Sequence, residues 1–520
     1  MSTNFIKLIQ NMYEKTSNHL KVNEGISRSF KTNQGVQQGD ILSPRLFNIF
    51  INDIPLLFDE TCEPPKLGNE SINCLMYADD LVILSESAIG IQNCLDRLKQ
   101  YTVEWGLEIN RNKTKVMIFQ KCGKRMKHDF KFGNLNIETT DKYKYLGTTI
   151  TNSGYFKTNQ NLAKKKGLRA AYLILNNIAP MSKPSTSIKI FEKVVEPILL
   201  YNCEVTEAFL PEKWDYEKFL TKIWDSSSEL NMVILSFLRQ ILGVHKKTTN
   251  IGLLAETGKF PVCLKVFSHI IKYWMRISTT KKSMLNQAYL VNCAENHKGK
   301  RSWMKMVKFL TTYTNTDENT IGSAKDIDRK IKIFKSKLYT KYTKWWKSQA
   351  TTTGVNKLDF YYKYKKTFKF ESYLDNVPKN LRKSITKLRL SCHSFPIETL
   401  RYSRVHIDRN DRLCKVCNLN EVGDEEHYIK RCKNELIEHT KLAFVKDIKE
   451  KFPLMTNFSN DNIIDYCLVM NDPKFQIPMA IYTKEIMDTF LEINDLQSKS
   501  TCPQKTRYGR QKKRPEKLDL

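Results

Sequence analysis

The sequence predicts an α+β fold in which a short strand hairpin lies between helices, followed by a mainly helical, basic region and a small metal-binding module. Two short apolar runs flank a polar pair within residues 72–84, as expected for a strand hairpin. Three cysteines and one histidine fall between residues 414 and 432, which suits a small metal-binding fold. A chain of 520 residues exceeds the size at which one hydrophobic core keeps growing, so we expect roughly two to four domains.

The first helix near the hairpin is predicted to begin at Ser43-Pro44. Serine is a good N-cap and proline suits the first helical position. Apolar residues then recur at helical spacing, so one face of the helix should be buried. They are Leu46, Phe47, Phe50, Ile51 and Ile54.

The segment INCLMYADDLVIL at 72–84 predicts a buried hairpin with Asp79 and Asp80 at its bend. Two adjacent carboxylates are costly to bury unless a cation neutralises them. A divalent metal does this, and Mg²⁺ suits phosphoryl transfer because it binds a few carboxylate oxygens together with substrate phosphates. An isolated Asp-Asp pair can also be a solvated turn. The apolar runs on both sides favour the metal site.

A second helix and more strands should follow the hairpin. One apolar stripe at helical spacing consists of Ile91, Leu95, Leu98 and Trp105. Gly106 is well placed as the C-terminal cap of this helix. Strands are predicted at 115–119 (KVMIF) and 143–150 (YKYLGTTI).

The charge balance indicates a polyanionic partner. Lysine and arginine total 85 against 55 aspartates and glutamates, a formal net charge of +30. Nucleic acid is the partner that this excess favours, and a basic surface kept for solubility is the alternative. The 13 cysteines are expected to be mostly reduced, and no apolar stretch is long enough to cross a membrane. We therefore expect an intracellular protein, in the nucleus or the cytoplasm.

Four sequence segments carry a family resemblance. They are GVQQGDILSPRLFNIFINDI at 35–54, YADDLVILSES at 77–87, GLEINRNKTKVMIF at 106–119 and YKYLGTTIT at 143–151. Together they resemble the reverse transcriptases of non-LTR (LINE-like) retrotransposons, in which these motifs occur in this order. The likeness covers residues 1–150 closely and continues loosely through PILLYNCEV at 197–205, which resembles the helical thumb of that family.

The resemblance implies an RNA-directed DNA polymerase with a palm domain that uses two Mg²⁺ ions. Its partners would be an RNA template, a DNA primer, dNTPs and target DNA. Asp79 would be a catalytic, metal-binding carboxylate and Asp80 its partner, and Tyr77 would lie against the primer terminus.

The same resemblance assigns a nucleotide-binding loop. Gln38 and Gly39 would approach the incoming nucleotide and the template, and a glycine lets a backbone come close to a ligand. Lys113 and Lys115 are candidates for the triphosphate, although a lysine on a loop is more often plain surface.

One departure from the family affects the expected activity. The family has a further aspartate on an earlier strand, with the fingers ahead of it, whereas residues 1–34 contain no aspartate. Two metal ions need several carboxylates to hold them. We therefore expect a truncated, carboxyl-terminal part of such a polymerase that does not polymerise unaided.

A cysteine and histidine cluster predicts a zinc site. Cys414, Cys417, His427 and Cys432 provide four ligands within 19 residues, which suits tetrahedral Zn²⁺. A redox CxxC pair is the alternative, but it leaves the histidine and the third cysteine without a role. With all four positions filled, the zinc should be structural. The surrounding segment resembles the cysteine-rich carboxyl-terminal part of the same polymerases, and its arginines suit contacts with nucleic acid.

The expected organisation has six parts. They are a partial palm at 1–155, a helical, basic, thumb-like region at 156–295, a basic, aromatic-rich connector at 296–385, the CCHC zinc module at 386–440, a helical region at 441–497 and a basic, disordered tail at 498–520. In the connector, interleaved lysines and aromatic residues suit either base stacking or the wet face of an amphipathic helix.

Other functions remain as alternatives to the polymerase. The main one is a catalytically inactive nucleic-acid-binding protein derived from such an element. A zinc-dependent nuclease is a weaker one, since the sequence offers no carboxylate constellation for it. Oligomeric state is not predicted.

Overall fold

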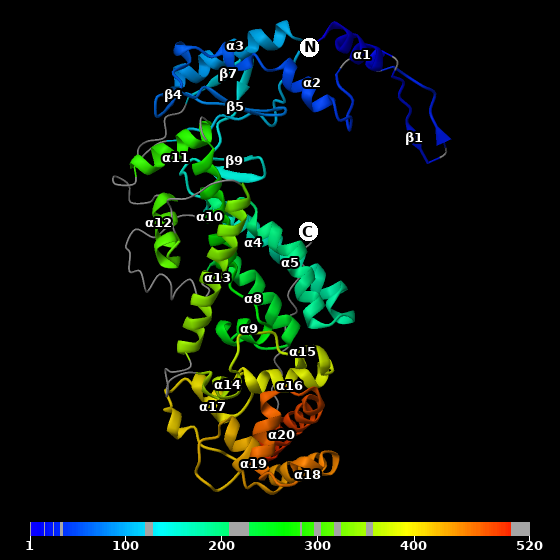
Figure 1. Cartoon of the computed structure of the whole chain (residues 1–520), viewed down its shortest axis with the longest axis vertical. Coiled ribbons are helices and arrows are strands. Elements are labelled where there is room, and N and C mark those ends of the chain that lie inside the picture. The colour runs from blue at the N-terminus through cyan, green and yellow to red at the C-terminus, as the bar shows by residue number, and fades with distance from the viewer. Residues whose placement is uncertain are drawn as a thin grey trace, which may run out of the picture. The chain divides into compact units, whose positions relative to one another are not determined.

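The chain forms two compact units in the computed structural model (Figure 1). The first unit comprises residues 1–143 and 151–154, and the second comprises 144–150 and 155–520. The structure describes residues 2–14, 16–23, 25–31, 35–119, 128–206, 228–280, 283–295, 303–316, 324–349 and 357–500.

The first unit combines three helices with small antiparallel hairpins. Its helices are α1 (Thr3–Glu14), α2 (Ser43–Phe50) and α3 (Ala88–Glu104), with short 3₁₀ turns at Ile54–Leu57 and Glu60–Cys62. Its strands pair as β1 (Lys21–Val22) with β2 (Gly25–Ile26), β3 (Lys66–Leu67) with β4 (Glu70–Ser71), β5 (Cys74–Tyr77) with β6 (Asp80–Ile83), and β7 (Phe130–Phe132) with β8 (Leu135–Ile137). A further two-stranded sheet joins β9 (Lys142–Tyr145) to β10 (Thr148–Thr151), and most of its residues, 144–150, are assigned to the second unit.

Helix α3 is the central packing element of the first unit. Its N-terminus is capped by Ser87, whose hydroxyl accepts a hydrogen bond from the Gly90 amide at 2.9 Å. After its last turn, Gly106 has a φ of 63°, as predicted for a C-terminal cap. Apolar side chains of α3 belong to two separate buried clusters, one with hairpin β5–β6 and one with hairpin β7–β8. The predicted helix is confirmed, although Trp105 stays 44% exposed.

Helix α2 is confirmed but shorter than its predicted stripe. It ends at Phe50, which is exposed, while Ile51 and Ile54 are buried beyond its end. Leu42 is the N-cap and provides no side-chain hydrogen bond. The Ser43 hydroxyl instead donates to the Gln37 carbonyl at 2.6 Å, so it ties the preceding loop to the helix.

Two strand predictions need correction. The segment 115–119 forms no strand, and only Val116 makes an isolated bridge, to Thr139. The segment 143–150 is not one strand, because a turn at Leu146 and Gly147 divides it into β9 and β10. Both turn residues have positive φ values, 43° and 81°, which are incompatible with a continuous strand.

The second unit is helical and has one continuous apolar core. Helix α4 packs on α5 and α8, α10 on α13, and both α16 and α18 on α20. The helices up to residue 348 are α4 (Lys157–Asn177), α5 (Pro184–Leu200), α6 (Cys203–Thr206), α8 (Glu229–Leu242), α9 (Asn250–Thr257), α10 (Val262–Thr279), α11 (Met284–Glu295), α12 (Trp303–Thr314) and α13 (Ala324–Ser348). Those that follow are α14 (Asp359–Tyr364), α15 (Tyr373–Asn376), α16 (Lys379–Arg389), α17 (Pro396–Thr399), α18 (Glu435–Lys451), α19 (Asn460–Val469) and α20 (Pro473–Ser500). In the part of the chain that the structure describes, no helix has the length and apolarity needed to cross a bilayer.

The aromatic residues of the predicted connector belong to this core. Tyr342 and Trp346 of α13 are 0% and 1% exposed, and Tyr361 and Tyr362 of α14 are buried as well. Their rings pack on protein neighbours, as Trp346 does on Tyr362 at 5.7 Å between centroids. Of the two alternatives for this segment, the burial of these rings favours an amphipathic helix over base stacking. The basic tail predicted at 498–520 lies almost wholly outside the described residues.

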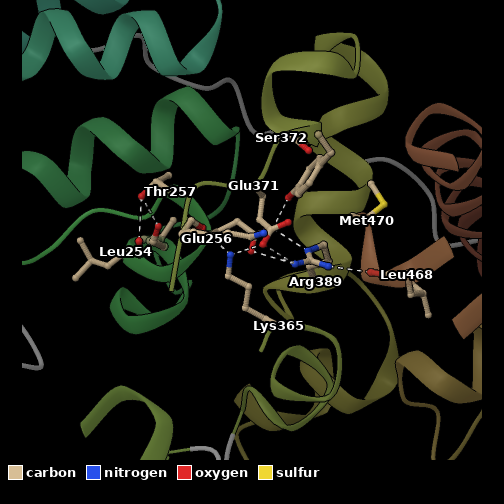
Figure 2. Close-up of polar contacts among 12 residues, drawn as sticks. Leu254, Glu256, Thr257, Lys365, Glu371, Ser372, Arg389, Leu468 and Met470 are labelled. Carbon is tan, nitrogen blue, oxygen red and sulfur yellow. Dashed lines mark hydrogen bonds and ion pairs between the residues drawn. The ribbon is translucent and has the colours of Figure 1, made fainter. Parts of the chain in front are cut away.

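A buried network of charges joins α9 to α16 (Figure 2). The Arg389 guanidinium donates through Nε to Glu256 at 2.8 Å and through Nη1 to the Leu468 carbonyl at 2.9 Å. Lys365 and Glu371 form a second ion pair in the same cluster. Burial opposes the charged form of Glu256, but the charges of Arg389 and Lys365 outweigh this and lower its pKa. The network fixes α9 against the carboxyl-terminal helices.

Candidate active site and metal centre

The Asp79-Asp80 pair lies at the tip of hairpin β5–β6. Tyr77 pairs with Asp80 across the hairpin, so Ala78 and Asp79 form a two-residue turn. Ala78 has a φ of 53°, a left-handed conformation that such tight turns require. The position of the pair at the bend agrees with the prediction.

The burial of this tip differs from the prediction. Tyr77, Asp79 and Asp80 are all exposed, and only Cys74 at the far end of the hairpin is buried. The apolar side chains of the strands are half-buried against α3. Both carboxylates are therefore exposed at the tip of a hairpin whose strands pack against α3. A site of this kind is open to a large substrate.

The loop before α2 holds Gln38 and Gly39 on the surface. Gly39 has a φ of 94°, so its backbone conformation favours glycine, while no neighbour in this structure would meet a Cβ there. The loop is attached by the Ser43 bond to Gln37 and by a 3.0 Å hydrogen bond from the Tyr13 hydroxyl to Asp40. Sequence reasoning gave no indication of the Tyr13 contact.

The remaining candidate site residues of the first unit have no polar contact with the two aspartates in the described part of the chain. Lys113 is exposed, and its amide donates to Asn110 at the start of its own turn. No hydrogen bond or ion pair among the described residues joins Gln38, Gly39 or Lys113 to Asp79 or Asp80. Nor does a third His, Cys, Asp or Glu among those residues complete a metal-binding group with the two aspartates.

The predicted zinc ligands come together in the second unit. The ligand atoms of Cys414, Cys417, His427 and Cys432 all lie within 4.8 Å of one another. His427 is 0% exposed and directs Nε2 toward the Cys417 sulfur, 3.3 Å away. Three thiols and one imidazole gathered in a mostly buried cluster are a donor set that fits tetrahedral Zn²⁺.

Hydrogen bonds around these ligands shift the pKa values of Cys414 and His427 in opposite directions. The Cys432 thiol donates to Cys414 and lowers the pKa of Cys414, so a thiolate is already favoured at that sulfur. Burial opposes a charge on His427, but hydrogen bonds with Cys414 and Glu421 outweigh burial and raise its pKa to about 9. The ring presents Nε2 to the cluster and Nδ1 to Glu421 at 3.0 Å. This is the arrangement in which a carboxylate orients a metal-binding histidine.

Glu421 was missed by sequence reasoning. It lies between the second and third ligands, and nothing in the spacing distinguishes it from a surface acid. Arg431 holds the same carboxylate through Nε at 3.0 Å. Among the acidic residues before His427, Asp424 accepts a hydrogen bond from the His427 amide at 2.8 Å. Glu425 is instead buried against His393 at 2.9 Å.

The arginines preceding the ligands are mostly engaged within the protein. Arg401 pairs with Glu398 at 2.8 Å and Arg409 with Asp359 at 3.4 Å, while Arg412 is buried and donates to backbone carbonyls. Arg404 is exposed and has no ion pair among the described residues. Arg404 is therefore the arginine of this segment that is most accessible for the expected contacts with nucleic acid.

Residues of the first unit match a known protein family. Residues 1–150 match the reverse transcriptase (RNA-dependent DNA polymerase) family. This part of the chain is therefore a reverse transcriptase domain, of the kind found in non-LTR retrotransposons, as its motifs predict.

Several proteins of non-LTR retrotransposons are similar to this chain in sequence. The chain is 32% identical over 163 residues to the Retrovirus-related Pol polyprotein from type-2 retrotransposable element R2DM of Drosophila melanogaster. It is 32% identical over 161 residues to the corresponding polyprotein from a type-1 R2 element of Nasonia vitripennis. It is 28% identical over 211 residues to the RNA-directed DNA polymerase from mobile element jockey of Drosophila melanogaster. The matches cover 30%, 29% and 38% of this chain but only 15%, 16% and 22% of those proteins.

Proposed function

We propose that this chain acts in RNA-directed DNA synthesis for a non-LTR retrotransposon, with Asp79 and Asp80 as its metal-binding carboxylates. The observation that carries the proposal is the exposed Asp-Asp tip of hairpin β5–β6 inside the residues that match the reverse transcriptase family. The substrates would be an RNA template, a DNA primer and dNTPs, and target DNA would be a further partner.

Different residues around the tip would bind the metal, the primer, the nucleotide and the template. Divalent metal, Mg²⁺ in our proposal, would activate the primer hydroxyl and stabilise the leaving pyrophosphate. Asp79 and Asp80 would hold it. Tyr77, 64% exposed beside them, would contact the primer terminus, and Gln38 and Gly39 would face the nucleotide and template. Lys113 is free to reach a triphosphate because its side chain is exposed.

Primer extension tests this proposal. The purified chain is incubated with a primed RNA template, dNTPs and Mg²⁺, beside Asp79→Asn and Asp80→Asn variants. A Glu70→Gln variant is the control, since it removes an exposed carboxylate from a different hairpin, β3–β4. If the chain extends the primer, Glu70→Gln should do so equally and the two aspartate variants should not. No extension by the native chain is the result expected of a truncated polymerase that does not polymerise unaided. Equal extension by all four proteins would contradict the roles given to Asp79 and Asp80.

A nucleic-acid-binding protein without turnover is the second candidate. It is favoured by the lack, among the described residues, of a third carboxylate beside Asp79 and Asp80. This function predicts RNA binding whose affinity falls steeply with salt, together with no nucleotide incorporation. Binding titrations at several salt concentrations, run beside the extension assay, separate the two candidates.

We further propose that Cys414, Cys417, His427 and Cys432 hold one structural Zn²⁺. Zinc bound by four protein ligands stabilises a fold and leaves no position for a reacting water. Zinc analysis of the purified chain should give one equivalent. A Cys417→Ser variant should lose it and Cys293→Ser, which alters a cysteine outside the cluster, should keep it. Loss of zinc from both variants, or from neither, would count against the assignment.

A further inference from the structure

A pocket of about 370 Å³ opens in the second unit beside the N-terminus of α9. Its size is in the range of small-molecule sites. It lies on elements other than those that carry Asp79 and the zinc ligands. Its lining residues are Arg239, Lys246, Thr248, Thr249, Asn250, Ile251, Gln349, Leu358 and Tyr362.

The charge of this pocket is positive and uncompensated. Arg239 and Lys246 line it, and no acidic side chain does. Neither cation forms an ion pair within the described ranges. Burial lowers the pKa of Arg239, with no carboxylate to offset the effect, yet a guanidinium stays charged at neutral pH. A half-buried arginine and an exposed lysine without a counter-charge attract an anion.

Backbone groups of α9 add to the positive potential. Asn250 begins the helix, and the N-cap residue Thr249 makes no capping hydrogen bond. The amides of Ile251 and Gly252 have no acceptor among the described residues. Free amides and the helix dipole at an N-terminus favour anions, phosphate groups above all.

An independent observation comes from two hydroxyl groups. Tyr362 is 7% exposed, yet its hydroxyl has no hydrogen-bond partner in the part of the chain that the structure describes. The buried Thr249 hydroxyl is likewise unpartnered there. A buried polar group left unpaired is unfavourable, so such groups usually meet a ligand or water. Both residues line the pocket, and both could donate to an anion.

Side-chain contacts restrain α9 at both of its ends. Arg239 donates through Nη2 to the Thr248 carbonyl at 3.0 Å and to the Asn250 side chain at 2.6 Å, which fixes the loop before α9. At the other end of α9, Glu256 is fixed by the charge network that includes Arg389 and Lys365 (Figure 2). A helix N-terminus restrained in this way keeps its amides aligned without a ligand, which favours binding.

We propose that this pocket binds the phosphate group of a phosphorylated ligand, either a mononucleotide or a nucleic-acid strand. Arg239 and Lys246 neutralise the charge, the α9 amides and the hydroxyls of Thr249 and Tyr362 donate hydrogen bonds, and the remaining volume accommodates an attached group. The proposal stands apart from the polymerase function, because every lining residue belongs to the second unit.

Titration calorimetry on the full chain tests the proposal with inorganic phosphate, adenosine 5′-monophosphate and an unphosphorylated single-stranded oligonucleotide as separate probes. Saturable binding of at least one probe, weakened about tenfold by Lys246→Glu and by Tyr362→Phe, is the expected result. Tyr362→Phe keeps the ring and its packing, so the fold is retained. Tighter binding of the mononucleotide than of phosphate identifies a nucleotide site, and tighter binding of the oligonucleotide identifies a strand.

A matched variant separates this site from general attraction to a basic protein. Lys189→Glu makes the same charge change at an exposed position of α5 that does not line the pocket. It should alter affinity less than twofold. The proposal fails if no probe saturates, if Lys189→Glu weakens binding as much as Lys246→Glu, or if Tyr362→Phe has no effect. Polymerase activity is measured separately and does not enter this result.

Discussion

Replacing Arg389 by methionine should destabilise the second unit strongly. Arg389 is 2% exposed and Glu256 is 0% exposed, and they are joined by hydrogen bonds of 2.8 and 3.3 Å. The substitution would leave Glu256 and Glu371 buried with Lys365 as their remaining cation, and the Leu468 carbonyl would lose its donor. Removing one partner of a buried ion pair costs about 3–5 kcal/mol, so we expect a loss of that size in the free energy of unfolding at pH 7.

Urea unfolding of the full chain, followed by helical circular dichroism, measures this loss through the change in midpoint. The matched control is the double variant Glu256→Gln with Arg389→Met, which removes both charges. It should be more stable than Arg389→Met alone, because no unpaired carboxylate remains. A loss below about 1 kcal/mol for the single variant, or a larger loss for the double variant, would refute the reasoning.

The pH dependence of the same pair provides a second check. In the native chain the pKa of Glu256 is lowered, so its contribution to stability is present above the unfolded-state pKa and is lost as pH falls through the folded-state pKa. Without Arg389, burial should raise the pKa of Glu256, and the folded variant would then take up a proton that relieves the buried charge. The difference in stability between the native chain and Arg389→Met should therefore shrink from pH 7 to pH 4. A difference that grows toward acid would contradict this assignment.

Three further outcomes are expected. Glu421→Gln should weaken zinc binding about 10- to 100-fold in competition with a chelator, because Glu421 orients the His427 ring; unchanged affinity would exclude that role. Zinc should be retained better against a chelator at pH 8 than at pH 6, since the raised pKa of His427, about 9, means that binding displaces a proton; retention independent of pH would contradict this. Gly258→Ala should cost more than about 1 kcal/mol of unfolding free energy, because its φ is 62° and a Cβ would lie 2.4 Å from the Phe370 amide nitrogen. Gly106→Ala, with a φ of 63° and open space, should cost less in the same denaturation experiment.

Local patterns predicted the parts of the candidate sites that are close together in sequence. The hairpin at Asp79 was recognisable because two apolar runs and a tight turn lie within 13 residues, and its strands pair in that register. The zinc cluster was recognisable because its four ligands lie within 19 residues. Exposure of the hairpin tip was not predicted, because continuous apolar runs are typical of strands covered on both faces, whereas these strands are only half-buried.

The sequence by itself therefore determined the reverse transcriptase motifs, their order and the composition of the zinc cluster, all of which depend on short-range spacing. Only the tertiary structure decided the pairing of Glu256 with Arg389, which are 133 residues apart. It also decided the burial of Trp346 and the meeting of Arg239 with Tyr362 around one pocket. The physical reason is the same in each case. Periodicity indicates that a helix has an apolar face, but which distant element covers that face depends on the packing of the whole unit.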